Sequence, residues 1–128
     1  MSAGLADTSV FIANKTGRPL RLDLIPEQLG VSIVTIGEFR ADVEAASDVA
    51  TRAQRLSTLT GVLRLDPLPV DESVAESCAN LRILLRDNGK RMPVSDSWMA
   101  ATPMALGVPV VTQDDDYVRV PGLDVICV

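Results

Sequence analysis

The spacing of apolar and polar positions predicts short strands that alternate with amphipathic helices. Apolar runs of strand length lie at residues 3–6, 31–34, 108–111 and 124–128. The proline-bearing segment 65–70 is either a short strand or an extended link. Strands that alternate with helices favour an α/β fold, a three-layer α/β/α sandwich around a central, mainly parallel sheet.

The helix boundaries follow from residues that can cap a first turn. Ser9 is the predicted cap of a short helix over residues 10–13. Thr35 is the predicted cap of a helix that ends near Ala46, and Glu38 completes a Thr-x-x-Glu capping box. The other predicted caps, with their apolar faces, are Asp48 before Val49, Ala53, Leu56, Leu59 and Leu63; Asp71 before Val74, Cys78, Leu81 and Leu85; and Ser95 before a helix that turns at Gly107.

Length and composition indicate one domain, residues 1–128, with a single core, because 47% of the residues are apolar. The two cysteines lack CxxC spacing, which fits two thiols in a reducing cytoplasm better than a disulfide. No basic segment followed by an apolar run opens the chain, so we expect no signal peptide. The most apolar window, residues 98–111, is broken by prolines and a glycine, so we expect no membrane helix.

The chain contains no histidine, which excludes Ser-His-Asp and Cys-His catalysis, histidine acid–base cleavage of RNA and histidine-bearing zinc sites. Carboxylates must therefore carry any catalysis. The net charge of −5 argues against a generally basic nucleic-acid binder. It leaves open a binder whose acidic groups are concentrated at a metal site.

Acidic residues stand at strand ends and helix starts, where a parallel sheet gathers its loops. They are Asp7, Glu38, Asp96 and the run Asp114 to Asp116. Each alone has a plain structural explanation, such as a helix cap or a solvated turn. Together they would repel, because two unit charges ~5 Å apart cost about 3 kcal/mol at an effective dielectric near 20. A cation offsets that cost, and an all-oxygen ligand set favours Mg²⁺ or Mn²⁺.

These motifs, in this order, resemble the PIN-domain nucleases, and in particular the small bacterial VapC-type toxins. The resemblance covers essentially the whole chain. It rests on Asp7-Thr8-Ser9 after a strand, Glu38 after Ser-Ile-Val-Thr-Ile-Gly, Asp96-Ser-Trp-Met-Ala-Ala, and Thr112-Gln113-Asp114-Asp115-Asp116-Tyr117, where the family often has Asp-Phe at the last two positions. One departure is Pro103, which should kink the helix that follows Asp96.

The resemblance implies a metal-dependent endoribonuclease that is neutralised by a VapB-type antitoxin and leaves 5′-phosphate and 3′-hydroxyl products. It implies that Asp7, Glu38, Asp96 and Asp114 form the catalytic carboxylate set around Mg²⁺ or Mn²⁺. Asp116 is expected at a second metal position, beside the ligands Asp7, Asp96 and Asp114, while Asp115 is expected to face outward. The hydroxyls of Ser9 and Thr112 are expected to hydrogen-bond to the metal ligands.

Several basic and aromatic residues outside the acidic set are candidates for RNA binding. Arg82, Arg86 and Lys90 share one helix face, which could be merely solvated. We favour RNA contacts for Lys90 and Arg91, which lie nearest Asp96 in sequence. Trp98 could stack on a base, but burial preferences favour a core or dimer-interface position.

The alternatives to an RNA-cleaving enzyme are weaker. A phosphoacceptor receiver domain needs a lysine after its last strands, and the only lysines are Lys15 and Lys90. A haloacid-dehalogenase-type phosphatase needs Asp-x-Asp at the first strand, where this chain has Asp7-Thr8-Ser9. A catalytically silent PIN fold that binds RNA or protein stays open. The mean hydropathy of +0.22 also suggests apolar surface for partners, so we predict a homodimer and a groove for an antitoxin segment.

Overall fold

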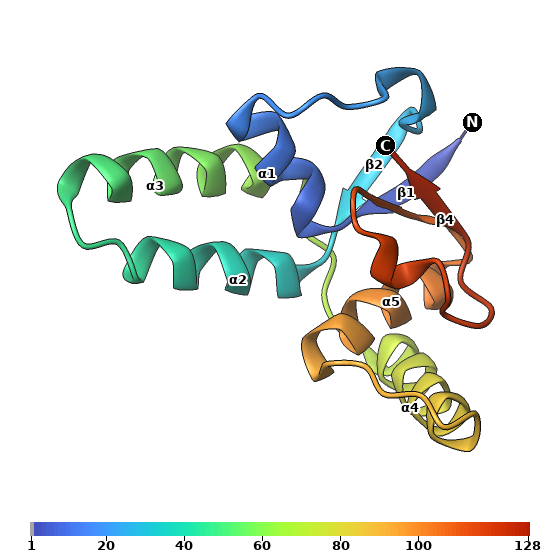
Figure 1. Ribbon diagram of the computed structural model, residues 1–128. Coiled ribbons are helices and arrows are strands. Elements are labelled where there is room, and N and C mark those ends of the chain that lie inside the picture. The colour runs from blue at the N-terminus through green and yellow to red at the C-terminus, as the bar shows by residue number, and fades with distance from the viewer. Residues whose placement is uncertain (1) are drawn as a thin grey trace.

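A four-stranded parallel sheet forms the centre of the molecule in the computed structural model, which describes residues 2–128 (Figure 1). Its strands are β1 (Ala3–Ala6), β2 (Gln28–Val31), β3 (Val110–Thr112) and β4 (Val125–Cys127), in the order β2–β1–β3–β4. Every pairing between them is parallel. The predicted α/β fold with a parallel sheet is therefore confirmed. No helix within residues 2–128 combines the length and the apolar character that crossing a bilayer requires.

Five α-helices surround the sheet. They are α1 (Thr8–Thr16), α2 (Ile33–Glu44), α3 (Val49–Leu63), α4 (Glu72–Asp87) and α5 (Val94–Leu106). In Figure 1, α2 and α3 form an antiparallel arm that projects to one side, and α4 packs with α5 below the sheet. Short 3-10 turns at Leu22–Leu24 and Asp115–Tyr117 complete the chain path.

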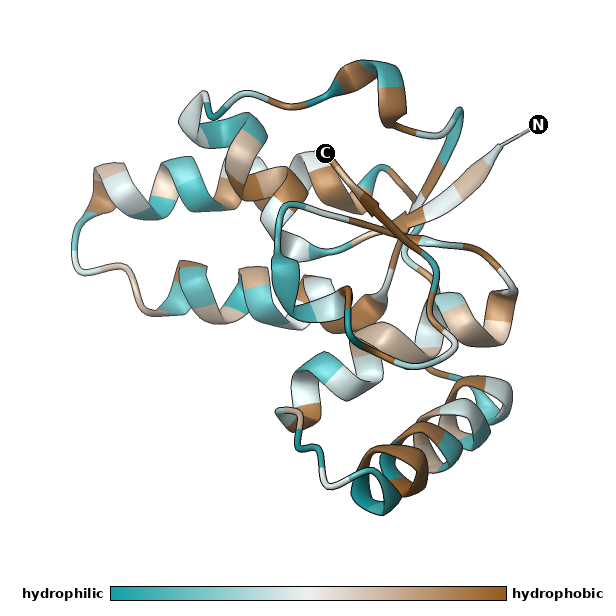
Figure 2. Ribbon diagram, turned by 45° about the vertical axis from the view of Figure 1, so that its right-hand side comes forward, coloured by the Kyte–Doolittle hydropathy of each residue, from teal (hydrophilic) through white to brown (hydrophobic). Residues whose placement is uncertain are grey.

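The helices cover both faces of the sheet, because successive residues of a strand point to opposite sides. Leu5 of β1 packs in a cluster with Leu81 of α4 and Met99 of α5. Its neighbour Ala6 packs in a second cluster with Val10 of α1. In Figure 2, β3 and β4 are coloured as hydrophobic, and all three residues of β3 are buried.

The arm formed by α2 and α3 has a small core of its own. Phe39 and Val43 of α2 meet Leu59 and Val62 of α3, and the Phe11 ring of α1 lies edge-on to Phe39 with ring centroids 6.2 Å apart. The arm is thereby tied to α1 at its base.

The second strand and the helix after it begin earlier than predicted. The strand spans Gln28–Val31 rather than 31–34, and α2 begins at Ile33. Ser32 is the cap, because its hydroxyl accepts a hydrogen bond from the Val34 N–H at 3.0 Å. Thr35 lies buried inside the first turn, so the predicted Thr35–Glu38 capping box is wrong.

Two other predicted caps are also wrong. Asp7, rather than Ser9, caps α1, which extends to Thr16. Ser95 lies inside α5, which begins after Pro93 without a side-chain cap. The helix continues through Pro103 to Leu106 and ends at Gly107, whose φ of 69° is a left-handed conformation that glycine adopts readily.

The segment 65–70 is an extended link and adds no strand to the sheet. Its one bridge joins Leu68 to Ser32. The two prolines of this segment lack the N–H groups that a longer ladder would need.

The apolar face predicted for α3 is only partly buried. Leu59 packs inside the arm, but Leu56 is 49% exposed and Val49 is 85% exposed. Because the arm consists of two helices alone, it cannot cover all the apolar residues of α3 within this chain.

Candidate functional site

The carboxyl ends of the two central strands place Asp7 and Thr112 side by side. Ala6 of β1 is in register with Val111 of β3, and the Asp7 N–H donates to the Val111 carbonyl at 3.0 Å. Both side chains are buried, with 4% of Asp7 and none of Thr112 exposed. Parallel pairing therefore brings together two residues that are far apart in the sequence.

Asp7 accepts hydrogen bonds at both carboxylate oxygens. Its Oδ1 accepts from the backbone N–H of Ser9 at 3.1 Å and also from the Ser9 hydroxyl. Its Oδ2 accepts from the Thr112 hydroxyl at 2.7 Å. The Ser9 and Thr112 hydroxyls, which were expected to hydrogen-bond to metal ligands, thus both donate to this carboxylate. Their hydrogen bonds fix its orientation.

The same two hydroxyls hold the loop that follows β3. The Asp114 N–H donates to Thr112 Oγ1 at 2.8 Å, and the Gln113 N–H donates to Ser9 Oγ at 2.9 Å. The Gln113 side chain donates to the Pro19 carbonyl at 2.9 Å, which ties in the loop after α1. This role of Gln113 had no signal in the sequence, because an amide in a polar run resembles any surface residue.

The Asp96 carboxylate accepts no hydrogen bond and pairs with no cation among residues 2–128. It lies half-buried in the first turn of α5. Burial raises its pKa above the usual aspartate value, and the charges of Asp114, Asp116 and Asp7 raise it further. Asp96 is therefore a carboxylate whose charge nothing in the described structure offsets.

The other carboxylates lie in the same electric field. Desolvation raises the pKa of Asp7 most, hydrogen bonds from Ser9 and Thr112 oppose that shift, and Asp114 adds a smaller increase. The pKa of Glu38 on α2 is raised by loss of water around the carboxyl, although the Thr8 hydroxyl donates to it at 3.2 Å, and by Asp96 and Asp7. Four separated segments of the chain thus bring carboxylates within electrostatic reach of one another.

Asp114 and Asp116 lie exposed at the rim of this group. Asp114 accepts a hydrogen bond from the Asp116 N–H at 3.2 Å and so caps the short turn over Asp115–Tyr117. Asp115 is also exposed. Capping explains the carboxylate of Asp114 in part, but it explains neither Asp96 nor Glu38.

Tyr117 was predicted only as the aromatic member of the last motif, and the structure places it beneath the acidic group. Its side chain is 5% exposed and packs in the core with Leu5 and Leu85. Burial raises the pKa of its phenol far above the usual value, and the charges of Asp96 and Asp7 act in the same direction. The phenol therefore stays protonated and can act only as a donor toward the carboxylates.

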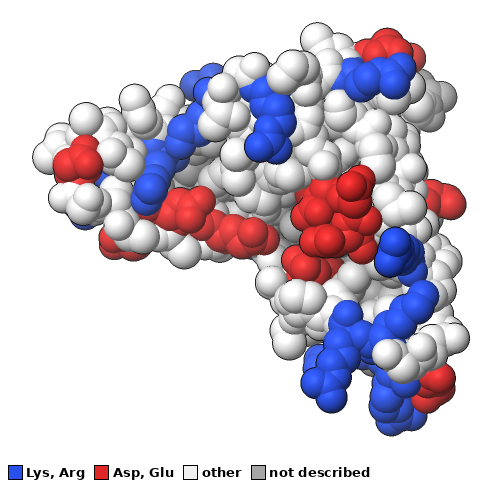
Figure 3. Space-filling model, viewed as in Figure 1, with Lys and Arg blue, Asp and Glu red and all other residues white. Residues whose placement is uncertain are grey.

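Acidic side chains form a central patch at the junction of the α2–α3 arm and the α4–α5 pair (Figure 3). Lysine and arginine side chains lie below this patch over α4 and above it near α1. Lys90 and Arg91, which follow α4, are exposed and line a hollow shared with Ser97. Trp98 is half-buried and packs against Val74, Cys78 and Ala101, which agrees with a core position rather than with base stacking.

The donor set suits a hard cation, although the side chains do not form a closed cage. Within residues 2–128, no three acidic, cysteine or histidine side chains are close enough together to enclose an ion. Mg²⁺ retains several water ligands and is usually bound through one or two carboxylates, so it does not need such a cage. The half-buried, unpaired Asp96 and the oriented Asp7 are the two carboxylates that could hold such an ion together with water.

Comparison with known proteins identifies relatives along nearly the whole chain. The PIN domain matches residues 5–123. Ribonuclease VapC5 of Mycobacterium tuberculosis is 45% identical over 121 residues, which cover 94% of this chain and 90% of that protein. Ribonuclease VapC4 of the same organism is 44% identical over 97% of this chain and 95% of its own length. A crystal structure of VapBC-5, a member of the VapBC toxin–antitoxin family from that organism, superimposes with a TM-score of 0.90 at 40% identity, covering 100% of both chains.

Proposed function

This chain belongs to the PIN domain family, among the VapC ribonucleases, and from that membership we propose that it is the toxin of a toxin–antitoxin pair, a metal-dependent endoribonuclease. It cleaves RNA phosphodiester bonds at Mg²⁺ or Mn²⁺ bound by carboxylates. The observation that carries this proposal is the unpaired, half-buried Asp96 in the field of Asp7, Asp114 and Asp116. A fold that served only as a scaffold would gain nothing from this repulsion.

The roles proposed for the residues are those that membership of the family implies. Asp7, Asp96 and Asp114 would hold the ion, Asp116 would serve a second metal position, and Glu38 would complete the catalytic set from α2. When bound, the ion supplies a water of lowered pKa and neutralises the phosphate oxygens. Ser9 and Thr112 keep the Asp7 carboxylate aimed, because they donate to its two oxygens.

The partners follow from the same membership. The RNA substrate passes over the acidic patch, and Lys90 and Arg91 contact its phosphates. The named structural relative is a toxin–antitoxin complex, so a VapB-type antitoxin is the proposed protein partner of this chain. The reducing cytoplasm, where RNA and the antitoxin meet, is the proposed location.

The alternative is a catalytically silent PIN fold that binds RNA or protein. It is favoured in part by Asp7 and Asp114, because both also act as caps. Incubation of the purified chain, freed of antitoxin, with a panel of folded RNAs and Mg²⁺ or Mn²⁺ separates the two. Cleavage that EDTA abolishes supports the enzyme, and intact RNA with both metals supports the silent module.

We expect Mg²⁺ or Mn²⁺ to raise the melting temperature of the metal-free protein. An ion that binds only the folded state stabilises it by about 2.7 kcal/mol at ~100 times its Kd. Differential scanning fluorimetry at millimolar metal measures this shift. Asp96→Asn is the control, which should lose the shift and be neutral or more stable without metal, because it relieves repulsion. An unmoved melting curve for the wild type would contradict the metal site.

The size of this shift should depend on pH in a defined direction. The pKa values of Asp7, Glu38 and Asp96 are raised in the folded state, so the folded protein holds protons that the unfolded chain has released. The stability of the metal-free protein therefore falls as pH rises through this window. The stabilisation by metal grows over the same window, because the ion needs ionised ligands. Melting curves at mildly acidic and neutral pH should show the larger metal shift at neutral pH.

We also expect a homodimer, because α3 exposes apolar side chains that the arm cannot cover. Light scattering after size exclusion should give about twice the chain mass of 13.7 kDa. Leu56→Glu, on the exposed face of α3, should shift the mass toward the monomer if this face forms the interface. A monomer for the wild type at micromolar concentration would contradict the expectation.

A further inference from the structure

A hollow of about 500 Å³ at the end of α4 is lined by four cationic side chains. The cations are Arg82, Arg86, Lys90 and Arg91, and Leu85 and Met92 add apolar surface. No acidic residue lines the hollow.

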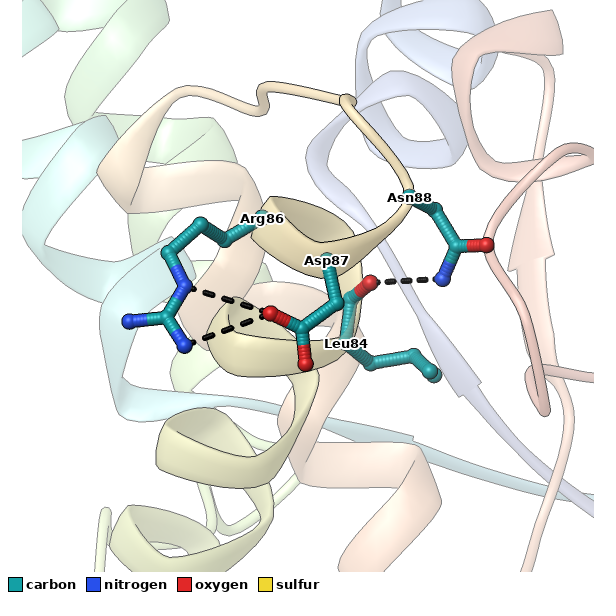
Figure 4. Close-up of polar contacts among 4 residues, drawn as sticks. All are labelled: Leu84, Arg86, Asp87 and Asn88. Atoms are coloured by element: carbon teal, nitrogen blue, oxygen red, sulfur yellow. Dashed lines mark hydrogen bonds and ion pairs between the residues drawn. The ribbon is translucent and has the colours of Figure 1, made fainter.

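The cations of this hollow are largely without acidic partners. Within residues 2–128, Arg82, Lys90 and Arg91 form no ion pair. Arg86 donates to Asp87 at 3.2 Å, as Figure 4 shows, but both side chains are well exposed, at 71% and 60%. An exposed pair of this kind contributes little, so Arg86 remains free to bind another anion.

Helix stability does not explain this arrangement. Arg82 and Arg86 are four residues apart on one face of α4, where like charges disfavour the helix. Arg86 in the last turn can interact with the carbonyl end of the helix dipole, but Arg82 lies before that turn and Lys90 and Arg91 lie beyond the helix. The Asn88 amide already donates to the Leu84 carbonyl at 2.7 Å (Figure 4).

The hollow adjoins the acidic patch. Ser97, one of its lining residues, directly follows Asp96 in α5. Figure 3 shows the basic side chains over α4 next to the central acidic patch. Gly89 leaves its side of the hollow open, since a Cβ added there would meet no atom within 4 Å. A polyanion whose reacting phosphate lies at Asp96 would thus bring a neighbouring phosphate over these cations.

We infer that this hollow is a phosphate-binding subsite for the RNA strand, in which Arg82 and Arg86 are the principal cations. This inference rests on the proposed function for the identity of the ligand. Arginine presents a planar fork of donors that fits two phosphate oxygens at once, which lysine cannot do. The subsite extends the RNA contacts from Lys90 and Arg91 back onto α4 and fixes the side on which the strand leaves the acidic patch.

The test is RNA binding by the full chain in EDTA, so that binding is measured apart from cleavage. Anisotropy of a labelled single-stranded RNA is followed over a range of KCl concentrations. Arg82→Gln/Arg86→Gln should bind roughly tenfold more weakly, and the slope of log affinity against log salt should flatten by about 0.7 for each lost phosphate contact. Arg82→Lys/Arg86→Lys should keep the slope while losing part of the affinity.

Arg64→Gln is the matched control, because Arg64 is an exposed arginine that directly follows α3 and lines a different hollow. It should change neither affinity nor slope. An unchanged slope in Arg82→Gln/Arg86→Gln would overturn the subsite. Weakened binding of the VapB-type antitoxin with unchanged RNA binding would assign the hollow to an acidic protein segment and overturn it as well.

Cleavage by the wild type with Mg²⁺ or Mn²⁺, measured in parallel, separates this inference from the proposed function. Cleavage with an unchanged slope in the double variant rejects the subsite alone. A flattened slope without wild-type cleavage supports the subsite and rejects the ribonuclease.

Discussion

Asp96→Asn is expected to reduce RNA cleavage by about 100-fold or more while the fold survives. The amide keeps the shape of the side chain but removes a half-buried charge that nothing in the described structure offsets. Loss of a group that merely orients a metal ligand typically costs about 10- to 100-fold, so loss of a ligand itself should reach or exceed that range. Single-turnover cleavage with Mg²⁺ or Mn²⁺ measures the effect, and circular dichroism reports the fold.

The other members of the set should behave in the same way, and a neighbouring residue supplies the control. Asp7→Asn, Glu38→Gln and Asp114→Asn should each lower metal affinity and cleavage together. Asp115→Asn removes one charge from the same exposed turn without touching the set, so it should do little. Full activity in Asp96→Asn would contradict the mechanism. An Asp115→Asn loss as large as that of Asp114→Asn would mean that the last motif has been misassigned.

Thr112→Val is expected to destabilise the protein by about 1–3 kcal/mol at neutral pH and to lower cleavage as well. Valine fills nearly the same space but leaves the buried Asp7 Oδ2 without its 2.7 Å donor. It also leaves the Asp114 N–H without its acceptor at 2.8 Å. Urea unfolding at pH 7 measures the stability, and cleavage assays measure the loss of activity that misplaced carboxylates cause.

Thr112→Ser distinguishes the contribution of the hydroxyl from that of the methyl group. It retains the donor and should recover most of the loss in cleavage, whereas Thr112→Val should not. The stability difference between Thr112→Val and the wild type should shrink as pH falls through the pKa of Asp7, because the lost bond favours the ionised carboxylate. Equal destabilisation by serine and valine would assign the effect to packing and contradict the hydrogen-bond explanation.

The sequence predicted which acidic residues lie close together more accurately than it predicted where helices and strands begin. Asp7, Glu38 and Asp96 could be grouped because the ends of parallel strands meet at one edge of a sheet. The start of α2 could not be placed, since Ser32 and Thr35 are both good caps and the intervening residues suit either a strand or a helix. Pairing of Val31 with Ala6 decides between them, and that contact is tertiary.

Asp7 shows why single residues were ambiguous. It caps α1 and also lies in the acidic group, so its structural role does not exclude the functional one. Its hydrogen bond with Thr112 spans most of the chain and leaves no local trace in the sequence. The exposure of Leu56 was likewise unpredictable from periodicity, which identifies an apolar face but not whether this chain covers it.

The pairing of β1 with β3 also sets when the molecule can become active during its synthesis. Asp7 leaves the ribosome before the helices α1 to α5 are made, but Thr112, which orients its carboxylate, follows all of them. Contacts this distant in sequence form late, because the intervening chain must first be ordered. A nascent chain that carries β1, β2 and the α2–α3 arm therefore lacks Asp96 and Asp114 and holds Asp7 without its partner. The acidic site can therefore assemble only after translation has passed Asp114, and it is absent while β1, β2 and the α2–α3 arm are made.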